Sequence, residues 1–329
     1  MKQVLDAEQR PFRFAALAGG VGGAKLAQGL AALLPPENLT IIVNTGDDMA
    51  YLGLKICPDM DTVLYTLSGR ANPSTGWGVK EDTFACLAAL TSLGEESWFK
   101  LGDQDLATHL LRTQGLREGK TLTQVSGDLA RRMGIIHPVL PMCDAPYPTL
   151  LETDAGVLDF QTYFVQQQCK PVVKRIYWNY KKPGEASAQV MRTLQEADCV
   201  IICPSNPFVS IDPILSLTGV RELLKTRFCA ALSPIIQGKA VKGPAAKMFQ
   251  ELGFTPSATA VAAYYQDLLS VFFLDEQDKA ELPAIKQLGM DCTAIPSLMP
   301  TLIERKHTAD LMIQYVKRLL LSKPLGEKI

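Results

Sequence analysis

Short runs of apolar residues, each followed by a turn and then by a helical pattern, recur along the chain. These runs are apolar throughout, which is typical of strands buried on both faces of a parallel sheet. They read FAALAGG, LTIIVNTGDD, CVIICPSNP and FCAALSPIIQGK, and they begin at positions 14, 39, 199 and 228. Alternation of such strands with helices predicts an α/β protein with a Rossmann-like, doubly wound, mostly parallel sheet.

A different pattern separates the second run from the third. Residues 81–134 read as three successive helices, each started by Asp or Thr and stopped by Gly, and residues 139–180 read as short strands and turns. We therefore expect a Rossmann-like nucleotide-binding core from residues 12–80 and 181–325, with a mainly helical insert at 81–180. Because doubly wound sheets bind ligands beyond the carboxyl ends of their strands, we expect the insert to cover an acceptor-substrate cleft there.

The loop after the first run is rich in glycine. Glycines let backbone N–H groups approach an anion closely, and the helix that follows presents its positive end, so the turn at residues 19–23 is a candidate phosphate site. The dinucleotide fingerprint fails because Lys25 stands at its third glycine, which disfavours an NAD oxidoreductase. The P-loop pattern fails because Leu26 stands where Ser or Thr is needed. A strand-to-helix turn that binds nothing is the alternative.

Acidic residues gather after the second run, in NTGDDMAYLGLKICPDMDT. Asp47 and Asp48 follow the strand directly, and Asp59 and Asp61 begin the next predicted helix. Mg²⁺ takes oxygen ligands and shares them with substrate phosphates, so carboxylates that converge near a phosphate site favour metal binding or catalysis. The alternatives are turn formation by Asp47 and Asp48, and N-capping of the helix by Asp59 or Asp61.

The loops after the third and fourth runs carry groups suited to a nucleotide. Ser205, Asn206 and Ser210 precede a helix, and we expect them to bind phosphate or ribose. In QGKAVKGP, Lys239 and Lys242 stand beside Gly238 and Gly243, and these lysines are predicted to supply point charges for a diphosphate. The alternatives are a proline-rich turn with a serine or aspartate as helix cap, and a solvated surface lysine.

Composition narrows the function classes. The net charge is −1 with no basic block, which disfavours nucleic acid as a partner. The eight cysteines form no C-x-x-C pair, so reduced thiols are expected rather than zinc ligands or disulfides. The three histidines share no spacing with the acids that marks a metal cluster, so each is expected to be structural. Without an apolar leader or a spanning segment, we expect a soluble, cytoplasmic protein with no membrane contact.

Several of these stretches together resemble the 2-phospho-L-lactate transferase family of coenzyme F-420 biosynthesis. They are GGVGGAKLAQGL, VNTGDDMAYLGLKICPDMDTVLYTLSG, WFKLGDQDLATHLLRT, LPMCD, CPSNPFVSI and GKAVKGP, and the likeness runs from about residue 14 to about residue 320. The most specific element is the block from GDD to PDMDT. The fold and the glycine turn are also similar to those of a gluconeogenesis-factor-like family, so the alternative function is a nucleotide-sugar-binding regulatory protein.

The resemblance implies a Mg²⁺-dependent phosphotransferase. Its donor would be a three-carbon acid activated by guanosine diphosphate, its acceptor the ribityl hydroxyl of the deazaflavin precursor Fo, and its leaving product GMP. It leaves open whether the donor carries phosphoenolpyruvate, phospholactate or phosphoglycerate, and a homodimer is expected. The sequence departs from the family pattern at Gln237, where a second glycine is expected.

The resemblance also implies roles for individual residues. Asp48, helped by Asp47 or Asp61, would hold Mg²⁺, and Asp47 or Asp48 would orient the attacking hydroxyl as a base. The residues implied to contact the diphosphate and nucleotide are Gly20, Gly22, Ser205, Asn206, Ser210, Lys242 and Gly243.

Overall fold

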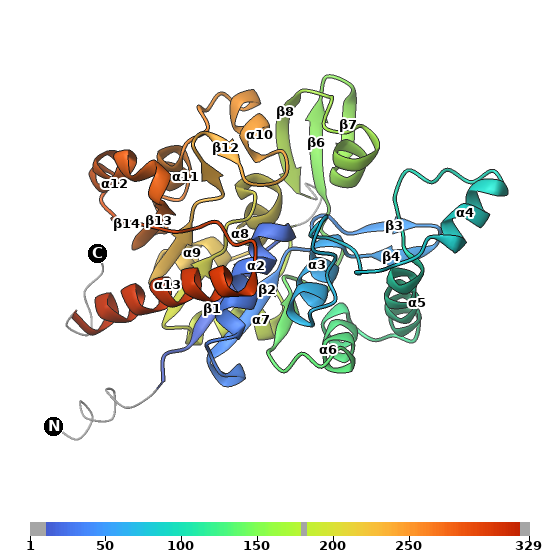
Figure 1. Cartoon of the computed structure of the whole chain (residues 1–329), viewed down its shortest axis with the longest axis horizontal. Helices are drawn as coiled ribbons and strands as arrows, with labels where there is room; N and C mark the ends of the chain where they lie inside the picture. Colours follow the sequence, from blue (N-terminus) through green and yellow to red (C-terminus); the bar gives the residue numbers. More distant parts are fainter. Residues whose placement is uncertain (1–10, 179–182, 323–329) are drawn as a thin grey trace.

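The computed structural model of the chain describes residues 11–178 and 183–322. Its central element is a seven-stranded sheet of order β14-β13-β10-β9-β1-β2-β5, in which each pair of neighbours is parallel (Figure 1). The strands are β1 (Phe14–Ala18), β2 (Leu39–Val43), β5 (Val139–Pro141), β9 (Cys199–Ile202), β10 (Cys229–Leu232), β13 (Val271–Asp275) and β14 (Asp291–Ile295). The predicted α/β, Rossmann-like sheet is confirmed, and all four apolar runs are strands within it.

The side chains of the central strands alternate between two hydrophobic cores. On β1, Phe14 and Ala16 pack into one core and Ala15 and Leu17 into the other, which explains why this strand is apolar throughout. The first core is covered by α2 (Gly20–Ala31), α3 (Pro58–Leu67), α6 (Leu122–Arg132) and α13 (Leu302–Ser322). The second is covered by α7 (Ala188–Glu196), α8 (Asp212–Leu215), α9 (Val220–Leu224), α10 (Ala245–Glu251), α11 (Ala258–Tyr264) and α12 (Leu282–Gln287).

The sheet grows outward from β1 in two directions. β1, β2 and β5 follow one another on one side, and the chain then crosses to β9 on the other side and continues through β10, β13 and β14. The order therefore reverses between β1 and β9. Loops that leave such a reversal point diverge and open a crevice at the carboxyl edge of the sheet, where doubly wound proteins bind their ligands.

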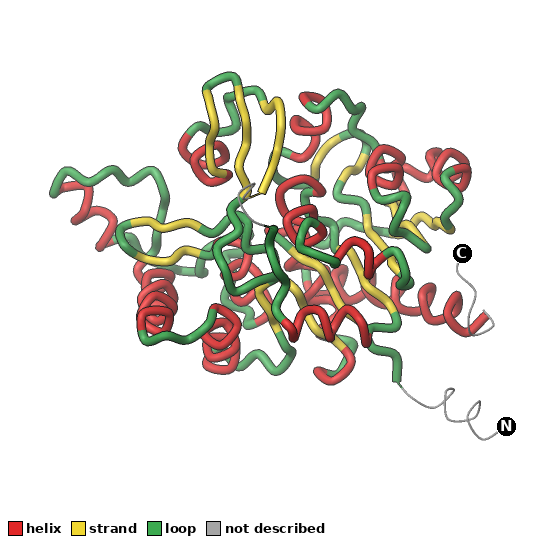
Figure 2. The backbone as a smooth tube through the Cα atoms, turned by 180° about the vertical axis from the view of Figure 1, so that it is seen from behind, coloured by secondary structure: helices red, strands yellow, loops and turns green. Residues whose placement is uncertain are grey.

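The region between β2 and β9 is more varied than a helical insert. Its three predicted helices are α4 (Ala85–Ser92), α5 (Asp103–Arg117) and α6, and they are followed by an antiparallel sheet of β6 (Thr149–Thr153), β7 (Gly156–Asp159) and β8 (Val173–Trp178). This small sheet lies above the central sheet in the views of Figure 1, where its strands are labelled, and Figure 2. β5 lies inside the expected insert range of 81–180, yet it pairs with β2 in the central sheet. That range is therefore not one separate insert, because the chain passes through the core in the middle of it.

Two short hairpins were not predicted. β3 (Met49–Tyr51) and β4 (Leu54–Ile56) form the first, which lies beside α4 and α5 on one side of the molecule (Figure 1). β11 (Ile235–Ile236) and β12 (Lys239–Ala240) form the second. In its turn Gln237 has a φ of 49°, so this residue adopts the left-handed conformation that the glycine expected here would supply.

The remaining elements are short. They are η1 (Pro36–Asn38), η2 (Thr162–Gln166), η3 (Pro207–Ile211) and η4 (Glu276–Glu281). No helix in the described ranges combines the length and the apolar character needed to cross a bilayer.

Candidate active site

A cavity of about 280 Å³ lies at the carboxyl edge of the sheet, bordered by the loops after β1, β2, β9, β10 and β14. The reversal of strand order between β1 and β9 predicts this location. Eight of the residues predicted for the site line the cavity: Gly20, Gly22, Asp47, Ser205, Asn206, Ser210, Lys242 and Gly243. Segments far apart in the sequence therefore meet in one place.

The glycine turn is held tightly against the loop after β9. A Cβ atom on Gly22 would lie 2.2 Å from the carbonyl oxygen of Pro204, so no other residue fits there without a backbone shift. The hydroxyl of Ser205 accepts a hydrogen bond from the N–H of Gly19 (3.1 Å) and donates one to its carbonyl (2.8 Å). Ser205 thus fixes the backbone of the turn, and Gly22 allows α2 to begin at the cavity wall.

Asn206 has a local structural role that sequence reasoning assigned to other residues. Its side chain accepts from the N–H of Phe208 (3.0 Å) and caps η3, the role that the alternative of a proline-rich turn gave to Ser210 or Asp212. Its amide nitrogen lies 3.4 Å from the sulfur of Met248. Asn206 therefore reaches the cavity from a rigid turn.

Two buried carboxylates, from Asp47 and Asp59, face the cavity together. The amide of Asn44 lies between them and donates to Asp47 Oδ1 (3.1 Å) and to Asp59 Oδ2 (2.9 Å). Asp59 Oδ1 also accepts from the N–H of Gly20 (2.7 Å), so an acid on α3 binds the first turn of α2. Among the described residues, no Lys, Arg or His side chain forms an ion pair with either carboxylate.

The electrostatics of this pair call for a cation. Burial raises the pKa of Asp59 to about 6, against the lowering effect of its hydrogen bonds from Asn44 and Gly20. Burial, followed by the charge of Asp59, raises the pKa of Asp47 well above its usual range. Two carboxylates that lack positive charge nearby are costly to ionise, and a hard divalent cation with oxygen preference would remove that cost. The donor set thus fits a hard divalent cation.

Asp48 and Asp61 do not line the cavity, which corrects the expectation that the acids converge on one phosphate site. Asp48 Oδ2 lies 2.9 Å from Lys55 Nζ and accepts from the thiol of Cys57 at 3.0 Å. Asp61 accepts from the guanidinium of Arg112 on both of its oxygens. Asp59 faces away from Asp61 because residues two apart on a helix lie on opposite sides of it, and Asp47 lies in the turn before β3, whereas Asp48 directly precedes that strand.

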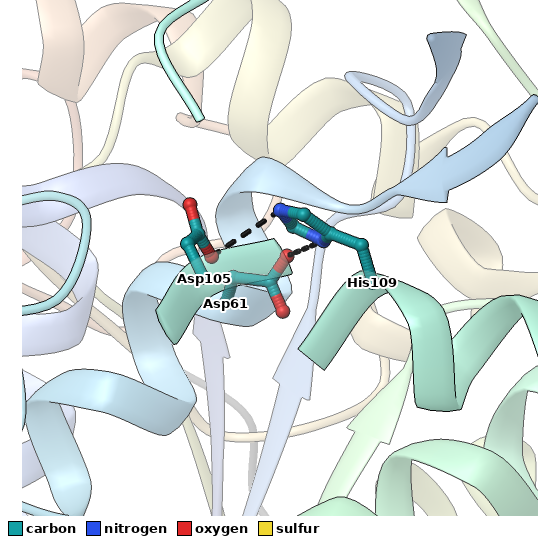
Figure 3. A group of neighbouring side chains, drawn as sticks. All are labelled: Asp61, Asp105 and His109. Carbon is teal, nitrogen blue, oxygen red and sulfur yellow. Dashed lines mark ion pairs between the residues drawn. The ribbon is translucent and has the colours of Figure 1, made fainter. Parts of the chain in front are cut away.

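A second acidic group lies away from the cavity lining. Asp61, Asp105 and His109 offer ligand atoms within 4.8 Å of one another, so this group could bind a metal ion. Figure 3 shows the imidazole between the two carboxylates, with Nδ1 3.6 Å from Asp61 Oδ2 and Nε2 3.2 Å from Asp105 Oδ1. Sequence reasoning missed this group, although Asp105 and His109 stand one turn apart on α5.

This second group already contains a fixed cation. Arg112 is fully buried beside it, and its Nη1 lies 3.1 Å from Asp61 Oδ2. The hydroxyl of Tyr65 donates to Asp105 Oδ1 at 2.6 Å. The charge of Asp61 is therefore balanced within the chain, unlike the charges of Asp47 and Asp59.

Aromatic side chains form another wall of the cavity. Phe160 and Phe164 are stacked, with ring centroids 5.3 Å apart and an interplanar angle of 8°, and Trp77 is 46% exposed. Phe160 follows β7 and Phe164 lies in η2, whereas α4, α5 and α6 contribute no lining residue. The part of the expected insert that lines the cavity is thus the end of its small antiparallel sheet and not its helices.

Two lysines, Lys25 and Lys242, line the cavity, whereas the predicted Lys239 is exposed on β12 and does not. Lys242 donates to the carbonyl of Thr75, and burial lowers the pKa of this lysine. Lys25 lies on α2, and sequence reasoning noted it only as a break in the dinucleotide fingerprint. Lysines in a cavity wall bind anionic groups as point charges, so the cavity has a cationic region as well as a carboxylate pair.

Known proteins resemble this chain in sequence and in fold. The family described as 2-phospho-L-lactate transferase CofD matches residues 14–292. A 2-phospho-L-lactate transferase of Methanosarcina mazei is 39% identical over 296 residues, covering 90% of this chain and 98% of the relative. A phosphoenolpyruvate transferase of Kitasatospora aureofaciens is 38% identical, covering 87% and 92%. A crystal structure of a UPF0052 family protein from Bacillus halodurans shares the fold, with a TM-score of 0.60 at 14% identity over 93% of this chain and 99% of that one.

Proposed function

The chain belongs to the 2-phospho-L-lactate transferase CofD family, and from that premise we propose a specific reaction for it. The protein moves a phospholactyl or phosphoenolpyruvyl unit from a guanosine-diphosphate-activated donor to the ribityl hydroxyl of Fo and releases GMP. This step belongs to the biosynthesis of coenzyme F-420. The observation that carries the proposal is the single cavity that joins diphosphate-binding groups, a carboxylate pair and an aromatic wall.

The diphosphate of the donor binds at the first turn of α2. The N–H groups at the start of a helix have no intrahelical acceptor and point toward an anion. Asp59 uses the N–H of Gly20, so the N–H groups of Val21 and Gly22 are the ones left for phosphate oxygens. Ser210, Lys242 and the other polar residues of the lining surround the rest of the nucleotide.

Mg²⁺ is held by Asp47 and Asp59 in this proposal, in place of the Asp48 and Asp61 that the sequence favoured. Only the first two acids line the cavity, and both lack a partner cation among the described residues. When bound, the ion neutralises charge on the diphosphate, as metal ions do in phosphoryl transfer.

The acceptor binds against the aromatic wall. A flat tricyclic ring stacks well on rings such as Phe160 and Phe164, and few polar groups are needed to hold it. The ribityl hydroxyl oxygen then attacks the phosphorus of the three-carbon phosphoester, and the bond from that phosphorus to the bridging oxygen breaks. The bonding electron pair leaves with GMP, and the hydroxyl proton passes to a carboxylate of the Asp47 and Asp59 pair. Positioning and charge neutralisation supply the rate.

The second candidate, a nucleotide-sugar-binding regulator, is less well supported. Such a protein requires the glycine turn and the lysines, but it has no need of unpaired carboxylates beside an aromatic wall. The solved structure from Bacillus halodurans shares the fold only. A homodimer, a cytoplasmic location and the identity of the three-carbon acid stay predictions, and relatives named for phospholactate and for phosphoenolpyruvate both exist.

The test is a product assay. The protein is incubated with Mg²⁺, Fo and, in turn, guanosine-activated phospholactate, phosphoenolpyruvate and phosphoglycerate, and the products are measured by mass spectrometry. We expect GMP and an Fo adduct that carries the three-carbon unit, with loss of both in EDTA and in Asp59→Asn. Asp310→Asn changes a half-buried acid of α13 that does not line the cavity, and it serves as the matched control. Absence of product with all three donors, together with stronger thermal stabilisation by UDP-sugars than by GDP, would move the assignment to the regulator.

A further inference from the structure

Lys25 is a cation of the cavity wall that has no anionic partner. It lies in the second turn of α2, lines the cavity and is about half-buried. Within the described ranges its ammonium group makes no hydrogen bond and no ion pair. Lys242 differs, because its ammonium group already donates to the carbonyl of Thr75.

The charged groups that act on the pKa of Lys25 are themselves cations. Burial first, and then the charges of Arg305 and Lys242, lower the pKa of Lys25. Arg305 donates to the side-chain oxygen of Gln28 and to the backbone carbonyls of Met299 (3.4 Å) and Pro300 (3.3 Å), so three acceptors hold it in this position. A half-buried cation among cations is unfavourable in the free protein, and an anion that enters the cavity removes that penalty.

Helix geometry directs this charge toward the glycine turn. Lys25 is five residues beyond Gly20, or about 7.5 Å along the helix axis. Side chains on a helix lean toward its N-terminus, so a lysine at this distance carries its ammonium group back toward the first turn. Asp59 binds the N–H of Gly20 at that same turn. The first turn of α2 therefore lies between an unpaired carboxylate pair and an unpaired lysine.

We propose that Lys25 is a further phosphate-contacting residue of the transfer reaction and binds the phosphate that departs with the nucleoside. This inference rests on the proposed function. When the bond between phosphorus and the bridging oxygen breaks, its electron pair stays on that oxygen, and the leaving phosphate gains negative charge. An unpaired cation stabilises the reaction most where charge develops. Lys25 needs no rearrangement to act, whereas Lys242 must first release Thr75.

The test compares Lys25→Met and Lys25→Arg with Lys286→Met, which removes an exposed lysine from α12. Thermal unfolding is followed in EDTA with GDP, inorganic diphosphate or guanosine, so that metal binding takes no part. We expect Lys25→Met to melt no lower than the wild type without ligand, because the substitution relieves repulsion. Its melting-temperature shift with GDP or diphosphate should fall below half of the wild-type shift. Lys25→Arg and Lys286→Met should keep most of that shift, and guanosine should not discriminate among the proteins.

Kinetics supply the second readout. Lys25→Met should lower kcat by about 10²–10³-fold, with a smaller change in KM for the donor, as expected for a group that acts on developing charge. Equal GDP shifts and kcat values within about twofold for Lys25→Met and the wild type would overturn the inference and leave the proposed reaction standing. A wild type stabilised by diphosphate but not by GDP would overturn the guanosine donor and leave Lys25 as a phosphate ligand. A wild type that no phosphate compound stabilises would overturn the role of Lys25.

Discussion

Removal of the Arg112 guanidinium should destabilise the protein strongly, because Asp61 then loses the cation that balances its charge. Arg112 is completely buried and the side chain of Asp61 is 7% exposed. In Arg112→Met the carboxylate of Asp61 stays buried, and His109 is the titratable side chain that still contacts it. Breaking a buried pair in this way costs about 3–5 kcal/mol. For a chain of 329 residues this corresponds to a drop in melting temperature of about 4–7 °C.

Urea and thermal unfolding of four proteins measure this effect. They are the wild type, Arg112→Met, Asp61→Leu and the double variant. A fifth protein, Arg117→Met, is the control, because Arg117 is an exposed arginine on the same helix. We expect the double variant to recover much of the loss, since an apolar pair of similar volume can replace a buried ion pair. Arg117→Met should change stability by less than about 0.5 kcal/mol.

Two results would refute the reasoning. A loss below about 1 kcal/mol in Arg112→Met would mean that Asp61 does not depend on this ion pair. Additive losses in the double variant would mean that the two side chains are not coupled. Restoration of Arg112→Met to wild-type stability by millimolar Mg²⁺ would instead identify Asp61, Asp105 and His109 as a metal site.

Three further outcomes follow from individual positions. In EDTA, the free energy of unfolding of the wild type, relative to that of Asp59→Asn, should fall as the pH rises from 3.8 to about 6. The reason is that the folded protein keeps a proton on Asp59 that the unfolded chain has released. Thermal melts that show the same difference at all these pH values would contradict the raised pKa of Asp59. Gly22→Ala should abolish product formation, because the added Cβ would collide with the carbonyl oxygen of Pro204. Gly127→Ala is the control: its Cβ would enter open space beside α6, and it should raise the free energy of unfolding by about 0.5–1 kcal/mol. Gln237→Gly should raise the free energy of unfolding by about 0.5–1 kcal/mol, since glycine relieves the left-handed conformation at the cost of some chain entropy, and a lower melting temperature would disprove this.

The central sheet was predictable where a strand is buried on both faces. β1 and β2 are apolar throughout and each is followed by a helical pattern, so residue type alone identifies them. β5 has three residues, ends in Pro141 and lies at the sheet edge, so it carries too little pattern to be distinguished from a turn. The β3–β4 hairpin has mostly half-buried side chains, which gives neither a continuous apolar run nor a clear alternation.

The acids of the site show a different limit. From residue type alone, all four acids were predicted to lie near the ligand. In the structure, backbone geometry directs only one acid of each neighbouring pair toward the cavity. Asp59 and Asp61 are two residues apart on α3, so one faces the cavity and the other faces α5. Helical spacing alone shows that these two cannot share a ligand, but it does not show which of them faces the cavity. That choice depends on where α2 and α5 pack against α3, and this is a property of the tertiary structure.

α3 therefore connects two polar systems of opposite character. Toward the cavity, Asp59 joins Asp47 in a pair whose charges are left for a ligand to balance. Toward α5, Asp61 is balanced within the chain by Arg112. A buried carboxylate that accepts from a guanidinium on both oxygens has a fixed geometry, whereas a carboxylate without a partner cation is held in place only by hydrogen bonds from its neighbours. The ion pair between Asp61 and Arg112 on one face of α3 thus helps to set the position of Asp59 on the other face. This explains why a buried arginine lies so close to the cavity but points toward Asp61.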